Sequence, residues 1–194
     1  MSRILSVDPS PGNTGYAFAI DGTIVEAYFN ELDESPIDGD RLVEGRKWFE
    51  ALLARLTPDL IVIEAYFFSA KFPMQAGMSP KIRGVFEMVA RQNENKIPYL
   101  VVPPSHWKKV VAGRATATPA QKKKWKTTAN KKFIIEALET RHGLKFPKTL
   151  KNPKSGRVVK FRYDVSDAIG ILIAHFLDTG VQYNLGPDLF DPKV

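Results

Sequence analysis

The chain has 194 residues, which is enough for one medium-sized domain whose hydrophobic core needs no covalent or metal support. It contains no cysteine and only three scattered histidines, so a disulfide framework and a thiolate zinc site are excluded. The N-terminus lacks the long apolar stretch of a signal peptide or a membrane span. We therefore expect a soluble, intracellular protein that does not associate with a membrane.

The net charge of +7 is unevenly distributed along the chain. Residues 103–163 contain 17 lysines and arginines against two acidic residues, whereas the remainder contains 11 against 19. A basic segment in an otherwise acidic chain indicates a surface for a polyanion, with nucleic acid the first candidate and an anionic membrane the second. For any single lysine the alternative is a solvated loop that keeps the protein soluble.

The N-terminal region predicts three antiparallel strands, at residues 4–7, 16–20 and 23–29. Asp21-Gly22, between the second and third strands, is typical of a hairpin turn. The sheet therefore begins as an antiparallel meander.

The next segments alternate between helices and strands. Apolar residues recur with helical spacing from Asp40, a candidate N-cap, to about Leu56. The continuous apolar runs 60–63 and 99–102 are typical of buried parallel strands. Between these runs, Ser79-Pro80 offers an N-cap and a first-turn proline for a second helix.

The C-terminal half predicts helices interrupted by basic loops. In order they are a short helix at 106–111, an irregular basic stretch at 113–125, a helix from Thr127 or Thr128 to Gly143, a second basic loop at 145–160 and a buried helix at 165–177. The whole order predicts an α/β fold with a five-stranded mixed sheet, three antiparallel strands then two parallel, and helices on both faces. We expect one domain at 1–182, with basic loops near 113–126 and 145–160, and a loosely attached tail at 183–194.

Four carboxylates stand where they could form one site. Asp8 and Glu64 each end an apolar strand, and neighbouring strands lie about 4.8 Å apart, so the two acids are adjacent if their strands pair in parallel. Asp164 and Asp167 share one face at the start of the last helix. Carboxylate oxygens are the ligands that Mg²⁺ prefers. Two such ions, about 3.5 to 4 Å apart, can promote phosphodiester hydrolysis.

Each acid also has a structural interpretation. Asp164 could simply complement the helix dipole, and Asp8, followed by Pro9, could be a turn residue. Glu64 and Asp167 are harder to explain in this way, because both lie among apolar residues and their burial requires a cation partner. The four acids together therefore indicate a functional site more strongly than any one of them does alone.

The motifs around these acids resemble the RuvC-like Holliday junction resolvases, of the divergent phage or viral type, over residues 3–177. They are Ile4-Leu5-Ser6-Val7-Asp8-Pro9-Ser10 with Gly15-Tyr16, Val62-Ile63-Glu64 with Phe67, and Asp164-Val165-Ser166-Asp167-Ala168. The resemblance implies an RNase H-like fold, a homodimer and symmetrical, magnesium-dependent cleavage of four-way DNA junctions in the cytoplasm of a bacterial or infected host cell. It implies that the four acids bind two Mg²⁺ ions, for which Mn²⁺ can substitute, and that no small-molecule cofactor is needed.

Further residues carry over from the same resemblance. The segment Ser105-His106-Trp107-Lys108-Lys109-Val110-Val111-Ala112-Gly113 is similar to the family's segment after its fifth strand, which makes Lys108 a catalytic candidate; Lys126 is the second. Phe67 matches an aromatic residue near the junction centre, and its alternative role is a core or dimer-interface side chain. The expected DNA-binding residues are Phe67, Lys108, Lys109, Lys122, Lys123, Lys124 and Lys126. The two basic insertions imply a wider range of branched substrates.

Two other functions fit parts of the sequence. The segment 8–15 resembles the phosphate-binding hairpin of actin-like ATPases, but those proteins need two such lobes. A protein that binds branched DNA through its lysines without cutting it would also have this charge distribution. Measurable ATP binding would favour the first alternative, and DNA binding without cleavage would favour the second.

Overall fold

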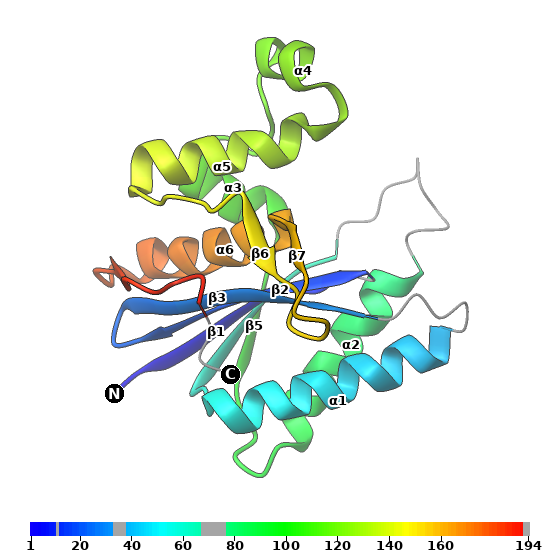
Figure 1. The fold of residues 1–194 in the computed structure, drawn as a ribbon. Helices are drawn as coiled ribbons and strands as arrows, with labels where there is room; N and C mark the ends of the chain where they lie inside the picture. Colours follow the sequence, from blue (N-terminus) through cyan, green and yellow to red (C-terminus); the bar gives the residue numbers. More distant parts are fainter. Residues whose placement is uncertain (11, 33–37, 67–76, 192–194) are drawn as a thin grey trace.

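The computed structural model describes residues 1–10, 12–32, 38–66 and 77–191 (Figure 1). In chain order the elements are β1 (Arg3–Asp8), β2 (Asn13–Ile20), β3 (Thr23–Glu31), α1 (Asp38–Leu56), β4 (Leu60–Glu64), α2 (Met78–Gln92), β5 (Tyr99–Val102), α3 (Pro104–Ala112), α4 (Pro119–Trp125), the 3₁₀ helix η1 (Lys126–Thr128), α5 (Ala129–His142), β6 (Thr149–Lys151), β7 (Val158–Lys160), α6 (Tyr163–Thr179) and β8 (Asn184–Leu185).

The central sheet has the strand order β5-β4-β1-β2-β3-β8. The pairs β1–β2 and β2–β3 are antiparallel, whereas β4 pairs in parallel with β1 and with β5. The predicted mixed sheet of three antiparallel and two parallel strands is therefore confirmed. A sixth short strand, β8, adds to it in parallel beside β3.

The turn between β2 and β3 follows from its two residues. Asp21 and Gly22 both have positive φ angles, of 47° and 78°. This is the backbone of a two-residue hairpin turn whose twist matches that of the strands, and glycine and aspartate adopt it at low cost. The turn sets the pairing of Ile20 with Thr23 and hence the register of the meander.

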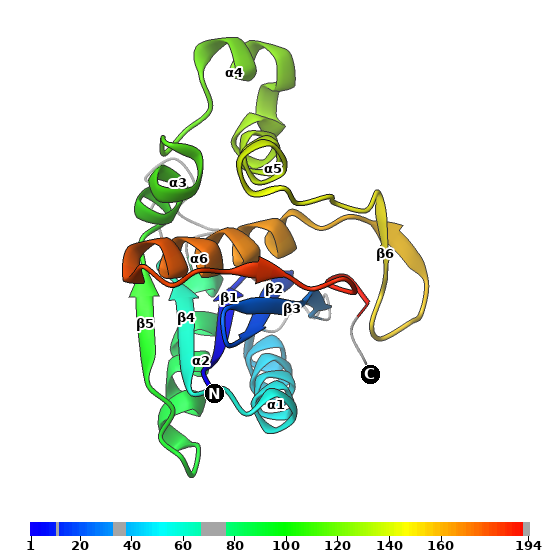
Figure 2. The same ribbon diagram turned by 90° about the vertical axis from the view of Figure 1, so that its left-hand side faces the viewer.

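Helices cover both faces of the sheet, as expected. Helices α1 and α2 pack together on one face, and α6 crosses the other, over β1 and β2 (Figures 1 and 2). Helices α3 and α5 form a further layer on α6. Within the described part of the chain, none of the helices combines the length and apolar character that a membrane crossing requires.

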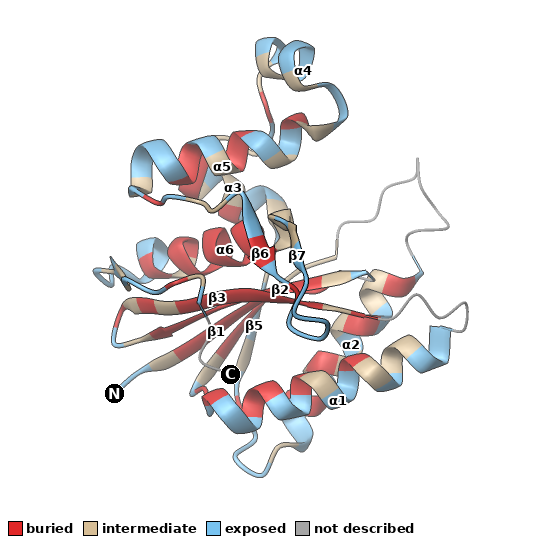
Figure 3. Ribbon diagram, viewed as in Figure 1, coloured by how far each residue is buried: buried red, intermediate tan, exposed pale blue. Residues whose placement is uncertain are grey.

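Helix α6 is the centre of the core. Almost all of its residues from Val165 to Phe176 are buried, and Figure 3 shows this burial continuing into the strands beneath it. The buried Ser6 hydroxyl donates to the carbonyl of Ala168 at 2.7 Å, which ties β1 to the helix. This bond satisfies a polar group that would otherwise be costly to bury.

Three segments differ from the expected loops and tail. Residues 113–125, predicted to be irregular, contain α4, whose N-cap Thr118 forms a capping box with Gln121. Residues 145–160 contain the antiparallel hairpin β6–β7. The expected loosely attached tail instead adds β8 to the sheet, and its Leu189 is buried.

Helix α2 begins at Met78, so Ser79 lies inside its first turn rather than at the N-cap.

Candidate active site

The parallel pairing of β1 with β4 places two acids side by side. Val7 is the register partner of Ile63, and Asp8 and Glu64 are the next residue of each strand. Both strands end at the same edge of the sheet, which is where binding sites form in open α/β sheets. Asp8 is 5% exposed, so its carboxylate is nearly removed from water.

Gly15 allows α6 to bring two further acids to this edge. Gly15 pairs with Asp8 across β1 and β2, and a Cβ atom built on it would lie 2.0 Å from the carbonyl oxygen of Asp164. Any side chain here would push away the first turn of α6. As a result, Asp164 and Asp167 line the same cavity as Asp8 and Glu64, with a volume of about 330 Å³.

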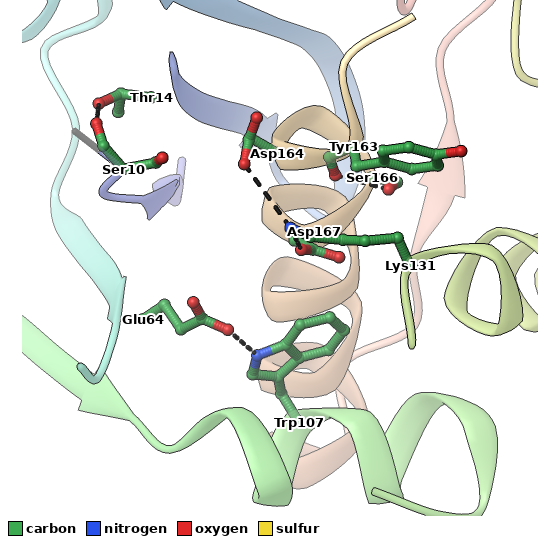
Figure 4. A network of polar contacts seen from close by, with 9 residues as sticks. All are labelled: Ser10, Thr14, Glu64, Trp107, Lys131, Tyr163, Asp164, Ser166 and Asp167. Carbon is green, nitrogen blue, oxygen red and sulfur yellow. Dashed lines mark hydrogen bonds and ion pairs between the residues drawn. The ribbon is translucent and has the colours of Figure 1, made fainter. Parts of the chain in front are cut away.

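Lys131 on α5 reaches into this acidic cluster, although the sequence analysis did not single it out. Its Nζ lies 2.7 Å from Oδ2 of Asp167 and 3.7 Å from Oδ1 of Asp164 (Figure 4). A signal was present, since Lys131 lies three and seven residues before the buried Ile134 and Leu138. This spacing puts the lysine on the face of α5 that packs inward.

Trp107 on α3 is a second contact that the sequence analysis did not assign. Its indole Nε1 donates a hydrogen bond of 2.7 Å to Oε1 of Glu64 (Figure 4). The indole ring is fully buried against Gly170 of α6, where a Cβ atom would come within 2.6 Å of the ring. Close packing thus fixes the tryptophan, and the tryptophan fixes the carboxylate of Glu64.

The cluster is electrostatically strained. Burial first, and then the negative charges of Glu64, Asp164 and Asp167, raise the pKa of Asp8 well above its usual range. Burial is also the main cause that raises the pKa values of Glu64 and Asp164. For Lys131, burial opposes the charged form, but the surrounding carboxylates outweigh it and raise its pKa. The site therefore favours additional positive charge.

The other predicted site residues lie in different places. Lys108 lines the cavity, with its Nζ 5.0 Å from the centroid of the Trp107 ring. Lys109 is exposed on α3, Lys126 is exposed at the start of η1, and neither belongs to the cavity lining. Phe67 falls outside the described residues. The lysines of α4, Lys122, Lys123 and Lys124, are exposed and also lie outside the cavity lining.

The donor set suits a hard divalent cation. All four acids offer oxygen ligands, and Oδ1 of the buried Asp167 has no hydrogen-bond partner. As the side chains stand, Asp164 and Asp167 contact the ammonium group of Lys131, whereas Glu64 accepts a hydrogen bond from Trp107. Among the described residues, no three acidic or histidine side chains are close enough together to hold one ion in this arrangement. The chemistry of the residues thus fits Mg²⁺, and Lys131 supplies counter-charge.

No family model matches the chain, and no curated protein does. Among solved structures, RuvC of Thermus thermophilus in complex with a Holliday junction substrate is similar over 92% of this chain and 95% of its own, with a TM-score of 0.63 and 16% identity. Another Thermus thermophilus RuvC structure has a TM-score of 0.61 and 16% identity, over 92% of this chain and 97% of its own. The yeast mitochondrial Holliday junction resolvase Ydc2 has a TM-score of 0.54 and 16% identity, over 91% of this chain and 78% of its own.

At this level of identity the likeness concerns the fold. It extends over nearly the whole of this chain. The resemblance noted in the sequence is thereby confirmed for the architecture. The chain has the RNase H-like α/β fold found in RuvC and Ydc2.

Proposed function

We propose that this protein is a metal-dependent endonuclease that cuts four-way and other branched DNA by phosphodiester hydrolysis. The observation that carries the proposal is the convergence of Asp8, Glu64, Asp164 and Asp167, from three separate segments, on one cavity that also contains two lysines. Several negatively charged carboxylates that are withdrawn from water and lie close together destabilise the folded state. Their convergence is explained when they bind cations and, through them, a phosphate.

The four carboxylates are proposed to hold Mg²⁺, or Mn²⁺ in its place. When bound, such ions lower the pKa of an attacking water and stabilise the leaving oxygen of the phosphodiester. Trp107 holds Glu64 through its indole N–H, so it acts as a positioning residue. Lys108 and Lys131, at the cavity wall, supply positive charge where negative charge develops on the scissile phosphate.

The choice of substrate rests on the fold and on charge. The similar RuvC structure contains a Holliday junction substrate, and Ydc2 is named as a Holliday junction resolvase. A four-way junction is roughly two-fold symmetric and must be cut twice, so a homodimer with two sites would match it. The basic segment 103–163 would provide phosphate contacts.

The direct test is cleavage of a mobile four-way junction in Mg²⁺, with mapping of the cut sites on all strands. Wild-type protein should cut at symmetrical positions, and both Asp8→Asn and Glu64→Gln should be inactive. Glu94→Gln, which alters an exposed acid after α2, is the control and should cut normally. If the two active-site variants cleaved as fast as wild type, this mechanism would be rejected. If the protein bound the junction but did not cleave it in Mg²⁺ or Mn²⁺, the nuclease proposal would be rejected in favour of a protein that only binds branched DNA.

Lys131 and Lys132 are a matched pair for testing the role of the lysine. They are adjacent on α5, but Lys131 contacts Asp167, whereas Lys132 is exposed. We expect Lys131→Met to lower the single-turnover cleavage rate by about 10- to 100-fold, because one stabilising cation is removed from the site. Lys132→Met should keep the wild-type rate on the same junction. Equal rates for the two variants would exclude Lys131 from the reaction.

A further inference from the structure

The hairpin β6–β7 and its flanks form a second basic surface, apart from the α4 lysines. Residues 145–162, called here the basic ribbon, contain seven lysines and arginines and no acidic residue. Lys154 pairs with Glu44 and Arg162 with Glu31. The other five cations form no ion pair with any described residue; they are Lys145, Lys148, Lys151, Arg157 and Lys160.

The ribbon is firmly attached to the rest of the fold. The hydroxyl of Tyr28 on β3 donates to the backbone carbonyl of Lys151, and the amide of Asn152 donates to Glu31. At the base of the ribbon, the ring centroids of Phe146 and Phe161 lie 5.1 Å apart, and both rings pack against Phe190. Such anchoring reduces the conformational entropy lost on binding.

The two faces of the ribbon differ in character. Leu150 and Val159 are a cross-strand pair, with Leu150 buried and Val159 partly buried against the core. Side chains alternate along a strand, so the neighbouring pairs point the other way. These pairs are Thr149 with Lys160 and Lys151 with Val158, and all four residues are exposed. The outer face is thus open, with a cation on each strand.

The position of the ribbon connects it with the candidate active site. Strand β7 ends at Lys160, four residues before Asp164. Figures 1 and 2 show the ribbon near the N-terminal end of α6. Arg162 between them is the N-cap residue of α6. A polyanion lying on the ribbon would therefore pass close to the acidic cavity.

We propose that the outer face of the basic ribbon binds the phosphate backbone of a duplex arm of the DNA substrate, next to the scissile phosphate. This proposal rests on the proposed nuclease function. Phosphate contacts from lysine and arginine fix the position of a duplex without reading its sequence. The ribbon would determine which phosphate of the arm reaches the cavity, while the acids and Lys131 carry out the chemistry.

The first test compares binding of a labelled four-way junction by two double variants, both in the inactive Asp8→Asn background. Lys151→Gln with Lys160→Gln neutralises the outer face, and Lys47→Gln with Lys96→Gln neutralises two exposed lysines outside the ribbon. Fluorescence anisotropy over a range of salt concentrations should show that the ribbon variant loses about ten-fold in affinity and about two units of salt slope. The control should match its parent. Identical curves for both variants would overturn the ribbon proposal.

The second test uses the absence of cysteine from the chain. Val158→Cys places a single thiol on the outer face, at a residue that is 69% exposed, and Val43→Cys places one on α1, at a residue that is 53% exposed. Each thiol is joined to a photo-activated azide reagent before the protein binds the junction. Label at position 158 should crosslink to one arm within a few nucleotides of the cut, and label at 43 should not. Equal crosslinking from both positions would contradict the proposal.

The two proposals can fail separately. If wild-type protein cuts junctions but the ribbon variants bind and crosslink like their controls, only the ribbon proposal is wrong. If wild-type protein neither binds nor cuts a junction, both proposals are wrong. If the ribbon variant loses binding while wild-type protein cuts nothing, the ribbon proposal holds and the nuclease proposal is wrong.

Discussion

Single residues set the distances in the candidate active site. Gly15 lets the first turn of α6 lie directly on β2, and Gly170 lets the Trp107 ring lie directly on α6. The first contact positions Asp164 and the second positions Glu64 through the indole N–H. Each glycine acts through the packing of its neighbours.

Gly170→Ala tests this indirect effect. The new methyl group would overlap the Trp107 ring, which must shift and weaken its hydrogen bond to Glu64. We expect a stability loss of about 1–3 kcal/mol from overpacking and a loss of cleavage rate of about 10- to 100-fold from misplacement of the acid. Urea denaturation and single-turnover cleavage would measure the two effects. Gly84→Ala, on α2 with open space around it, should leave cleavage unchanged and slightly stabilise the helix.

Asp8→Asn should stabilise the protein at neutral pH when no divalent cation is present. Burial and neighbouring negative charges raise the pKa of Asp8, so the folded state binds its proton more tightly than the unfolded chain. The stability that this group contributes is complete below about pH 3.9 and is lost as pH rises through the folded-state pKa. In EDTA at pH 7 we expect the variant to melt a few degrees above wild type, and the difference to vanish near pH 3.5. A lower Tm at pH 7 would contradict the electrostatic account.

At the scale of elements, α4 depends on local interactions. It has no buried residue, and its first turn is held by the reciprocal capping box of Thr118 and Gln121. Gln121 also contacts Arg114 and Glu136, which connects the short helix with its surroundings. The expected DNA contacts of Lys122, Lys123 and Lys124 remain a prediction, and they depend on this helix being formed.

Thr118→Ala tests the cap. Loss of an N-cap hydroxyl typically costs about 1 kcal/mol, and α4 has little packing to compensate. We expect amide hydrogens of residues 120–125 to exchange about five-fold faster, with the rest of the chain unchanged, in a hydrogen-exchange experiment read by mass spectrometry. Thr127→Ala, an exposed threonine in η1, is the control. Unchanged exchange in α4 would show that the cap is not needed.

At the scale of the whole molecule, the C-terminal segment completes the sheet. Strand β8 pairs with β3, and the backbone N–H of Ala27 donates to the carbonyl of Leu189 at 2.8 Å. Leu189 is 5% exposed, and its neighbour Phe190 packs on the rings at the base of the ribbon. The segment thus covers a sheet edge that would otherwise be open to intermolecular pairing.

Leu189→Ala distinguishes an integral segment from a loosely attached one. Truncation of a buried leucine typically costs about 2–5 kcal/mol, which for a chain of this size lowers Tm by about 5–15 °C. Thermal unfolding followed by circular dichroism would measure it. Leu177→Ala removes a leucine that is 45% exposed and should change stability by less than about 1 kcal/mol. Equal changes in Tm for the two substitutions would mean that residues 183–191 contribute little to the stability of the fold.

The sequence by itself determined the five main strands, their order along the chain and the acids that end two of them. These features depend on neighbouring residues, such as the turn residues Asp21-Gly22 and the apolar run before Glu64, and they can be recognised without knowing the fold. The acids could be grouped because parallel strands of one sheet end at the same edge. The likeness of the motifs to the RuvC-like proteins pointed to the same fold.

Only the tertiary structure decided which distant side chains meet. Lys131 and Asp167 are 36 residues apart, and Trp107 and Glu64 are 43 apart, so no local pattern joins them. The pairing of β8 and the anchoring of the basic ribbon likewise depend on contacts across the whole chain. Local patterns specify strands and helices, whereas the packing of α3, α5 and α6 selects the partners of each acid, because close packing leaves one arrangement for the buried side chains.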